Sequence, residues 1–356
     1  MALASHDEYM ERYHYALKKE IIDFADQEDQ KYGLKTIYMG GGTPSTYPLP
    51  LLLDTFATLK SRFTFASDIE VTLEVNPGAI TQEAVQMWES MGINRLSVGI
   101  QSLQDEALHT LNRLQKKADV VELFTIVPKY ISNVSVDFIL GLPYVSSSQW
   151  KEMILEAMQW PITHISIYFL MVHEKTPLYF KIRTNVVTLP PDEEIIELYW
   201  WTVQTLQQYG FERYEVSNFA KKGFESRHNK AYWDRKKYKA FGLGACSFDG
   251  KFRFQNEKQL LKYMSNVELN APIVYEQEEL TLQQIKTERI MLGLRLTQGM
   301  QVDEVIYDFT DREKEQFYTT VQELQAQGFL EYTKGRIALT PHGFLVENEV
   351  AVRLFP

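Results

Sequence analysis

Three polar side chains stand at the ends of successive strand-like segments of the sequence: Glu74, Gln101 and Asp137. Carboxylates and amides at such positions can bind ribose hydroxyls or an amine. Arg113, in the helical segment after the strand that ends at Gln101, could hold a carboxylate through two parallel hydrogen bonds. Each of these residues could equally be a structural hydrogen-bonding group. Together they indicate a pocket for a charged, nucleoside-like molecule.

A glycine-rich turn, Gly40-Gly-Gly-Thr-Pro-Ser45, directly follows a short apolar strand-like run. Glycine lets the main chain approach a ligand closely, and the start of the next helix offers unpaired N–H donors. The turn is not a phosphate-binding loop, because no Gly-Lys-Ser/Thr follows at the required spacing. The alternative is a plain tight turn between strand and helix. A small ligand with an amino-carboxylate or a ribose would fit the turn.

His228 belongs to the segment Arg227-His-Asn-Lys-Ala-Tyr-Trp233, which places Tyr232 and Trp233 nearby. Histidine is a common axial ligand of haem iron, and aromatic rings pack well on a porphyrin face. The alternative is a histidine that is hydrogen bonded inside its domain. Cys246 is the single cysteine, and we expect it to be buried as a small apolar residue.

The cysteine count and the charge exclude several classes of protein. A single cysteine allows no internal disulfide, no tetrathiolate zinc site and no iron–sulfur cluster held by three or four cysteines of this chain. The formal net charge of −10 disfavours general binding to nucleic acid or membranes. The 356 residues contain neither an apolar run of membrane-spanning length nor a signal-peptide profile, so we expect a cytoplasmic protein.

Strand-like and helical segments alternate along the first half of the chain. After a helix at 5–28, the strands fall at 36–39, 69–75, 95–101, 133–139 and 164–170, and the helices at 49–62, 81–92, 104–128 and 147–159. This rhythm is typical of parallel βα units in an α/β fold. Because ligands bind at the carboxyl ends of the strands of a βα barrel, the polar strand ends predict one shared site.

The remainder of the chain divides into two further parts. A helix is predicted at about 191–209, and from about 280 helices at 281–294, 301–308 and 311–327 precede a β-hairpin with a Lys334-Gly335 turn. Helices followed by such a hairpin describe a small winged-helix unit. We therefore divide the chain into a barrel (1–190), a completing region with the His228 segment (191–275) and a C-terminal winged-helix-like domain (276–356).

The chain resembles the oxygen-independent coproporphyrinogen III oxidases and their haem-chaperone relatives, which are radical S-adenosylmethionine (SAM) proteins. The resemblance covers nearly the whole chain and implies a partial (βα)6 barrel with a smaller C-terminal domain. It rests on motifs that occur in the order of the family: Gly40–Ser45, Glu74–Pro77, Ser97–Ser102, Leu111–Arg113, Asp137–Pro143, Tyr214–Phe219, His228–Trp233 and Gly242–Ala245.

The resemblance also implies roles for particular residues. Gly41 and Gly42 would contact the methionine part of SAM, with Thr43 beside them, and the rest of the pocket would be lined by Glu74, Gln101, Arg113 and Asp137. The motif His-Asn-x-x-Tyr-Trp is associated with the haem-chaperone branch, the HemW type. It implies that His228 is a ligand of haem iron, supported by Tyr232 and Trp233.

One departure from the family is large. Family members begin with a strand and a loop holding Cys-x-x-x-Cys-x-x-Cys, the ligands of a 4Fe–4S cluster whose open iron binds SAM. Here Met1–Ser5 lead directly into the predicted helix, so the first strand and the three cysteines are missing. Either the sequence begins late or the protein has lost the cluster. We favour a late beginning, because losing a barrel strand exposes an unpaired edge.

The sequence supports one function best and leaves two others open. The first is a haem chaperone that binds haem and passes it to acceptor proteins; the resemblance also allows a homodimer. The second is decarboxylation of coproporphyrinogen III to protoporphyrinogen IX, which requires the cluster. The third is DNA binding by the winged-helix unit, which the acidic charge and a hairpin with only Lys334 and Arg336 disfavour. We therefore expect no nucleic-acid partner.

Overall fold

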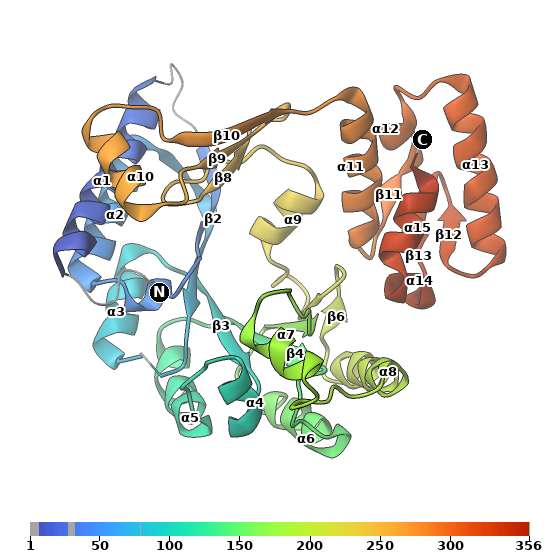
Figure 1. Cartoon of the computed structure of the whole chain (residues 1–356), viewed down its shortest axis with the longest axis horizontal. Helices are drawn as coiled ribbons and strands as arrows, with labels where there is room; N and C mark the ends of the chain where they lie inside the picture. Colours follow the sequence, from blue (N-terminus) through green and yellow to red (C-terminus); the bar gives the residue numbers. More distant parts are fainter. Residues whose placement is uncertain (1–6, 28–32, 79, 356) are drawn as a thin grey trace. The chain divides into compact units, whose positions relative to one another are not determined.

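The computed structural model describes residues 7–27, 33–78 and 80–355, and in it the chain forms two compact units (Figure 1). The first unit comprises Met1–Leu34, Pro50–Ala66 and Ser226–Pro356. The second comprises Lys35–Leu49 and Ser67–Glu225. Each unit therefore combines segments that are distant in the sequence.

The second unit is built on a curled seven-stranded sheet with the strand order β1-β2-β3-β4-β5-β7-β6. Neighbouring strands from β2 to β5 are parallel, as the sequence predicts, whereas β7 runs antiparallel to both β5 and β6. The prediction of parallel strands covered only the segments up to 164–170, and the antiparallel β7 lies beyond it, after the short connection from β6. The strands are β1 (Gly33–Met39), β2 (Thr64–Val75), β3 (Arg95–Gln101), β4 (Asn133–Leu140), β5 (His164–Phe169), β6 (Glu212–Arg213) and β7 (Asn218–Ala220).

Helices cover this sheet and bury its central strands. They are α3 (Gln82–Met91), α4 (Asp105–Thr110), α5 (Lys117–Ile126), α6 (Ser147–Ala157), α7 (Pro177–Arg183) and α8 (Asp192–Gln208). The buried apolar residues of β3 and β4 alternate along each strand and so share one face of the sheet, whereas the opposite face carries polar side chains such as Ser97, Ser135 and Asp137. The buried Trp150 donates a hydrogen bond from Nε1 to Thr202 Oγ1 at 2.8 Å, which ties α6 to α8. The predicted α/β half-barrel is confirmed.

The single helix expected at 104–128 is in fact two helices. The chain leaves α4 at Leu111 and passes through Asn112, whose φ of 55° lies in the left-handed region that asparagine tolerates. After α5 the chain continues in the short 3-10 turn η2 (Val127–Lys129), where Pro128 removes a main-chain donor. The interruption places Arg113 in an irregular segment at the rim of the sheet instead of on a helix face.

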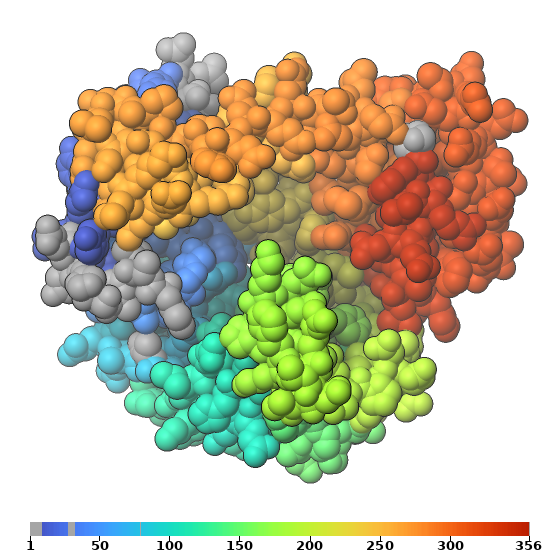
Figure 2. Space-filling model, in the orientation of Figure 1, coloured from blue at the N-terminus to red at the C-terminus, as the bar shows by residue number. Residues whose placement is uncertain are grey.

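Between β5 and α8 the chain makes an exposed excursion that includes α7. Met171 and Phe180 are 73 % and 54 % exposed in this segment, which stands out on the face shown in Figure 2. Thr176 caps α7 by accepting a hydrogen bond from the Tyr179 N–H, and Pro177 occupies the first turn. Across the described part of the chain, no helix has both the length and the apolar character needed to cross a membrane.

The first unit begins with the predicted amphipathic helix, now α1 (Asp7–Gln27), which packs on α10. The buried carboxylate of Glu20 accepts hydrogen bonds from the Gly242 N–H, Asn256 Nδ2 and Tyr263 Oη. A three-stranded antiparallel sheet in the order β10-β9-β8 follows in the same unit. The remaining elements here are α2 (Leu49–Arg62), α9 (Arg227–Trp233), β8 (Cys246–Phe248), β9 (Phe252–Asn256), α10 (Leu260–Glu268) and β10 (Val274–Glu279).

The last part of the first unit has the helices and hairpin that the sequence predicts. It comprises α11 (Leu282–Arg295), β11 (Met300–Gln301), α12 (Val302–Ile306), α13 (Asp311–Ala326), β12 (Leu330–Thr333), β13 (Arg336–Leu339), α14 (Pro341–Leu345) and α15 (Glu347–Leu354). The three strands pair in the order β11-β13-β12. Lys334 and Gly335 both have positive φ, as a two-residue hairpin turn requires. The expectation that a first barrel strand is missing concerns Met1–Ser5, which lie outside the described residues.

Candidate functional site

Glu74 is fixed in the glycine-rich turn by two hydrogen bonds. Its Oε1 accepts from Tyr38 Oη at 2.7 Å, and its Oε2 accepts from the Gly41 N–H at 3.0 Å. A Cβ on Gly40 would lie 2.8 Å from Glu74 Oε1, so the close approach of the turn requires glycine there. Burial and the adjacent Glu74 carboxylate raise the pKa of Tyr38, which keeps its phenol protonated as the donor. Tyr38 is a site residue that no motif in the sequence identified.

A second chain of hydrogen bonds joins the turn after β1, the end of β2 and the segment that follows α4. Asn76 Nδ2 donates to Thr43 Oγ1 at 2.9 Å, and Arg113 Nη1 donates to Asn76 Oδ1 at 2.7 Å. The structure thus brings two of the predicted residues, Thr43 and Arg113, together through Asn76. Asn76 belongs to the same motif as Glu74, Glu74–Pro77, and this position in the motif is the feature of the sequence that could have identified Asn76 as a site residue.

Gln101 ends β3 in a strained conformation. Its φ of 64° lies in the left-handed region, which is uncommon for a residue other than glycine. The side-chain amide reaches back over β3, and a Cβ on Gly99 would lie 3.0 Å from Gln101 Nε2. Gln115 Nε2 donates to the carbonyl oxygens of Gly99 and Ile100 at 3.2 and 2.5 Å. A side chain from beyond α4 therefore holds the end of β3 in place. Strain of this kind is typical of functional positions.

Asp137, the register partner of Gly99 on the next strand, has a buried carboxyl group with an unused acceptor. Oδ2 accepts from Ser97 Oγ at 3.3 Å, whereas buried Oδ1 has no hydrogen-bond partner among the described protein groups. Burial raises the pKa of Asp137 to about 6, against the lowering effects of the Ser166 hydroxyl and the Arg95 charge. A buried acceptor of this kind suits a ligand that carries a hydroxyl or an amine.

Two further buried polar side chains lie deeper in the same sheet. Arg95, only 2 % exposed, is close enough to Asp137 for its charge to lower the pKa of that carboxyl. His164 has both ring nitrogens engaged, Nδ1 with Ser135 Oγ at 2.7 Å and Nε2 with Tyr214 Oη at 2.8 Å. Burial, reinforced by Arg95, lowers the pKa of His164 well below 6.5, so it is a neutral structural histidine. Sequence reasoning missed Arg95.

In the first unit, the His228 segment forms the short helix α9. Ser226 begins it, since Ser226 Oγ accepts from the Asn229 N–H at 3.2 Å. His228 Nε2 and Tyr232 Oη lie 3.1 Å apart, and their rings stand at 90° with centroids 5.0 Å apart. One helical turn separates the two residues, so the spacing in the sequence accounts for the contact.

The aromatic contacts continue from α9 onto the neighbouring strands, but Trp233 leaves in another direction. The Tyr232 and Tyr238 rings meet edge to face at 4.8 Å, and Tyr238 lies 6.1 Å from Phe248 of β8. The Trp233 ring instead contacts the guanidinium of Arg295 on α11, 5.0 Å from the ring centroid. The structure therefore brings Tyr232 to His228 and turns Trp233 toward the C-terminal helices.

Cys246 corrects an expectation drawn from the sequence. It is exposed, not buried: Cys246 is the first residue of β8, an edge strand, and burial begins only at the following residues, Ser247 and Phe248. Its Sγ accepts a hydrogen bond from Gln255 Nε2 at 3.3 Å.

Radical SAM proteins hold an iron–sulfur cluster and SAM, and the residues of this chain fit these two groups unequally. The sequence has one cysteine, and within the described ranges no three His, Cys, Asp or Glu side chains are grouped to hold a metal. These residues therefore do not fit a cluster bound by three thiolates. The glycine turn with Glu74, together with the unused acceptor of Asp137, does fit a nucleoside that carries an amino acid.

Comparison with known proteins first defines the class. Residues 4–157 match the model of the Radical SAM superfamily, and residues 280–346 match the HemN C-terminal domain. The structure superposes on coproporphyrinogen III oxidase (HemN) from Escherichia coli with a TM-score of 0.84 at 19 % identity, covering 99 % of this chain and 84 % of that one. The chain thus has the radical SAM fold of HemN, as its motifs predicted.

Full-length relatives then define the family. The chain is 30 % identical to the heme chaperone HemW of Bacillus subtilis, over 97 % of this chain and 90 % of the relative. It is also 30 % identical to the heme chaperone HemW of Synechocystis, over 98 % of this chain and 89 % of the relative. The chain belongs to the heme chaperone HemW family.

Proposed function

We propose that this protein binds haem at α9 and delivers it to acceptor proteins, with His228 as a ligand of the haem iron. Membership of the heme chaperone HemW family supports the activity. The observation that carries the site is the His228–Tyr232 contact, because a hydrogen-bonded imidazole beside an exposed aromatic ring suits an axial ligand on a porphyrin face. Haem is the cargo in this proposal.

We further propose that the carboxyl ends of β1 to β4 bind SAM. Gly41 and Gly42 would accept the methionine part, with Thr43 beside them, and the unused oxygen of Asp137 would accept from a donor of the ligand. When bound to a reduced iron–sulfur cluster, SAM supplies radical chemistry in this superfamily. The remaining lining residues of the proposed pocket are Glu74, Gln101 and Arg113.

The side chains available in this chain limit which chemical steps can be proposed for it. This chain's own residues do not fit a three-thiolate cluster, so we derive no radical step from them. What these residues do is bind and orient: Tyr38 keeps Glu74 aimed at the glycine turn, and Asn76 joins Thr43 to Arg113. Decarboxylation of coproporphyrinogen is less well supported than haem binding, because the relatives that are 30 % identical over nearly the whole chain are named heme chaperones.

The haem proposal is tested by titrating ferric haem into the purified protein and into His228→Ala, following the Soret band. We expect the variant to bind at least about tenfold more weakly and to show a shifted Soret maximum, as loss of a metal ligand does. His173→Ala is the matched control, because His173 is exposed and lies in the other unit. Equal spectra and affinities for His228→Ala and the unmodified protein would reject His228 as the ligand.

A further inference from the structure

Helix α9 has no hydrophobic anchor of its own. It is seven residues long, from Arg227 to Trp233, and none of them is buried. A helix of this length is not stable in isolation, and packing of an apolar face normally fixes such an element. Its position therefore depends on contacts with the neighbouring elements of the same unit.

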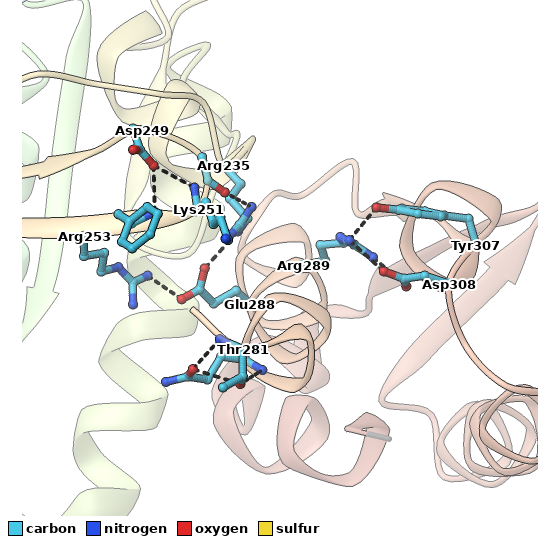
Figure 3. Close-up of polar contacts among 12 residues, drawn as sticks. Arg235, Asp249, Lys251, Arg253, Thr281, Glu288, Arg289, Tyr307 and Asp308 are labelled. Carbon is cyan, nitrogen blue, oxygen red and sulfur yellow. Dashed lines mark hydrogen bonds and ion pairs between the residues drawn. The ribbon is translucent and has the colours of Figure 1, made fainter. Parts of the chain in front are cut away.

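At the carboxyl end, a carboxylate from α11 binds two arginines (Figure 3). Glu288 Oε2 lies 2.8 Å from Arg235 Nε, two residues beyond α9, and Glu288 Oε1 lies 2.5 Å from Arg253 Nη2 on β9. The Glu288 side chain is 8 % exposed and that of Arg235 17 %, so this pair is largely shielded from water, whereas the Arg253 side chain is 45 % exposed. Removing one partner of such an arrangement leaves an uncompensated buried charge, which is strongly unfavourable.

A continuous series of contacts leads from Glu288 to the candidate haem ligand. The Arg235 guanidinium lies over the Phe248 ring at 4.7 Å, and Phe248 contacts Tyr238 at 6.1 Å. Tyr238 meets Tyr232 edge to face at 4.8 Å, and Tyr232 in turn holds the imidazole of His228. Every step is a direct contact between packed side chains.

A second contact connects the same two helices independently. Arg295, on the last turn of α11, lies over the Trp233 ring at 5.0 Å. Glu288 and Arg295 are seven residues apart and therefore lie on one face of α11. One face of this helix thus reaches both the last residue of α9 and the turn that follows it.

We infer that Glu288 is a positioning residue for His228: through Arg235, Phe248, Tyr238 and Tyr232 it sets the orientation of the imidazole. The inference rests on the proposed function, because it takes haem binding at His228 as the activity that is positioned. It assigns to α11 the task of holding α9 in position.

The test replaces Glu288 by Gln, which keeps the shape of the side chain and removes its charge. The first measurement is made without haem: the imidazole resonances of His228 in histidine-labelled protein, assigned by their loss in His228→Ala. The second is haem affinity with the position of the Soret band. We expect Glu288→Gln to shift the His228 resonances and to weaken haem binding by about tenfold, the usual effect of losing an outer partner of a metal ligand.

The matched control is Glu313→Gln, which removes the charge from an ion pair with Lys286 on the same helix α11. That pair joins α11 to α13, so its loss should leave the His228 resonances and the Soret band unchanged. Unshifted His228 resonances in Glu288→Gln would overturn the inference, as would equal shifts in the control.

Two further outcomes distinguish a failure of this inference from a failure of the proposed function and from a failure of the variant to fold. If His228→Ala binds haem as the unmodified protein does, the proposed function fails, while the haem-free resonances still decide the role of Glu288. If Glu288→Gln does not fold, Arg253→Gln replaces it, because that side chain is 45 % exposed and its loss breaks one of the two ion pairs of Glu288 together with a contact on the Phe248 ring, 6.0 Å from its centroid. The same shift of His228 is then expected, and its absence overturns the inference.

Discussion

Replacement of Asp137 by asparagine should stabilise the protein near neutral pH. Burial raises the pKa of Asp137 from 3.8 to about 6 in the folded chain. A carboxyl group with a raised pKa binds its proton more tightly when folded, so stability is greatest at low pH and is lost as the pH rises through about 6. A shift of about two pKa units corresponds to roughly 3 kcal/mol across the whole titration. The asparagine amide does not ionise and would avoid this loss.

Urea unfolding of the two proteins at pH 4.5 and pH 7.5 measures the effect. Between these two conditions, about 2 kcal/mol of the Asp137 contribution is lost, so the difference in unfolding free energy between variant and unmodified protein should grow by that amount. The same variant should bind SAM more weakly, because an amide carries no charge toward a donor on the ligand. Parallel stability–pH curves for the two proteins would refute the reasoning on Asp137.

Three further predictions test other parts of the structure. Tyr38→Phe removes the phenol that orients the glycine-turn carboxylate and should weaken SAM binding about fivefold, the equivalent of one hydrogen bond, in equilibrium dialysis; unchanged affinity would count against the pocket. Tyr232→Phe should shift the Soret band of the haem complex with little change in melting temperature, whereas an identical spectrum would separate Tyr232 from the haem site. Gly299→Ala should lower the unfolding free energy by about 3 kcal/mol, because the added Cβ would lie 1.9 Å from a main-chain oxygen. Gly328→Ala is the control: Gly328 also has a positive φ but open space around it, so the loss should be only about 1 kcal/mol. Equal losses in the two variants would contradict the packing of β11 on β13.

Local periodicity and the rules of parallel sheets were sufficient to predict the positions of most elements. Alternating strands and helices placed Glu74 and Asp137 at one edge of a sheet, and the structure has them on β2 and β4 of one sheet, with β3 between them. The His228–Tyr232 contact also follows from the sequence, since it spans a single helical turn. These features depend on residues that are close in the sequence or on the regular alternation of strand-like and helical segments.

The missed features depend on groups that are distant in the sequence. The helix expected at 104–128 is interrupted at Asn112, a single residue in the left-handed region. The antiparallel strand β7 contains only three residues, too few for an apolar pattern to predict it. Cys246 is exposed at the first position of β8, a strand whose place at the edge of its sheet only the strand pairing reveals. Arg95 reads as the first residue of an apolar strand, and its proximity to Asp137 appears only when β3 and β4 are placed side by side.

The most direct test of the account is the identity of the ligand on the haem iron. Electron–nuclear double resonance of the ferric complex, made with nitrogen-15 histidine, detects a histidine nitrogen bound to the iron. We predict a strong histidine nitrogen coupling in the unmodified protein that is absent from His228→Ala and retained in His173→Ala. A coupling that persists unchanged in His228→Ala would contradict haem ligation by α9.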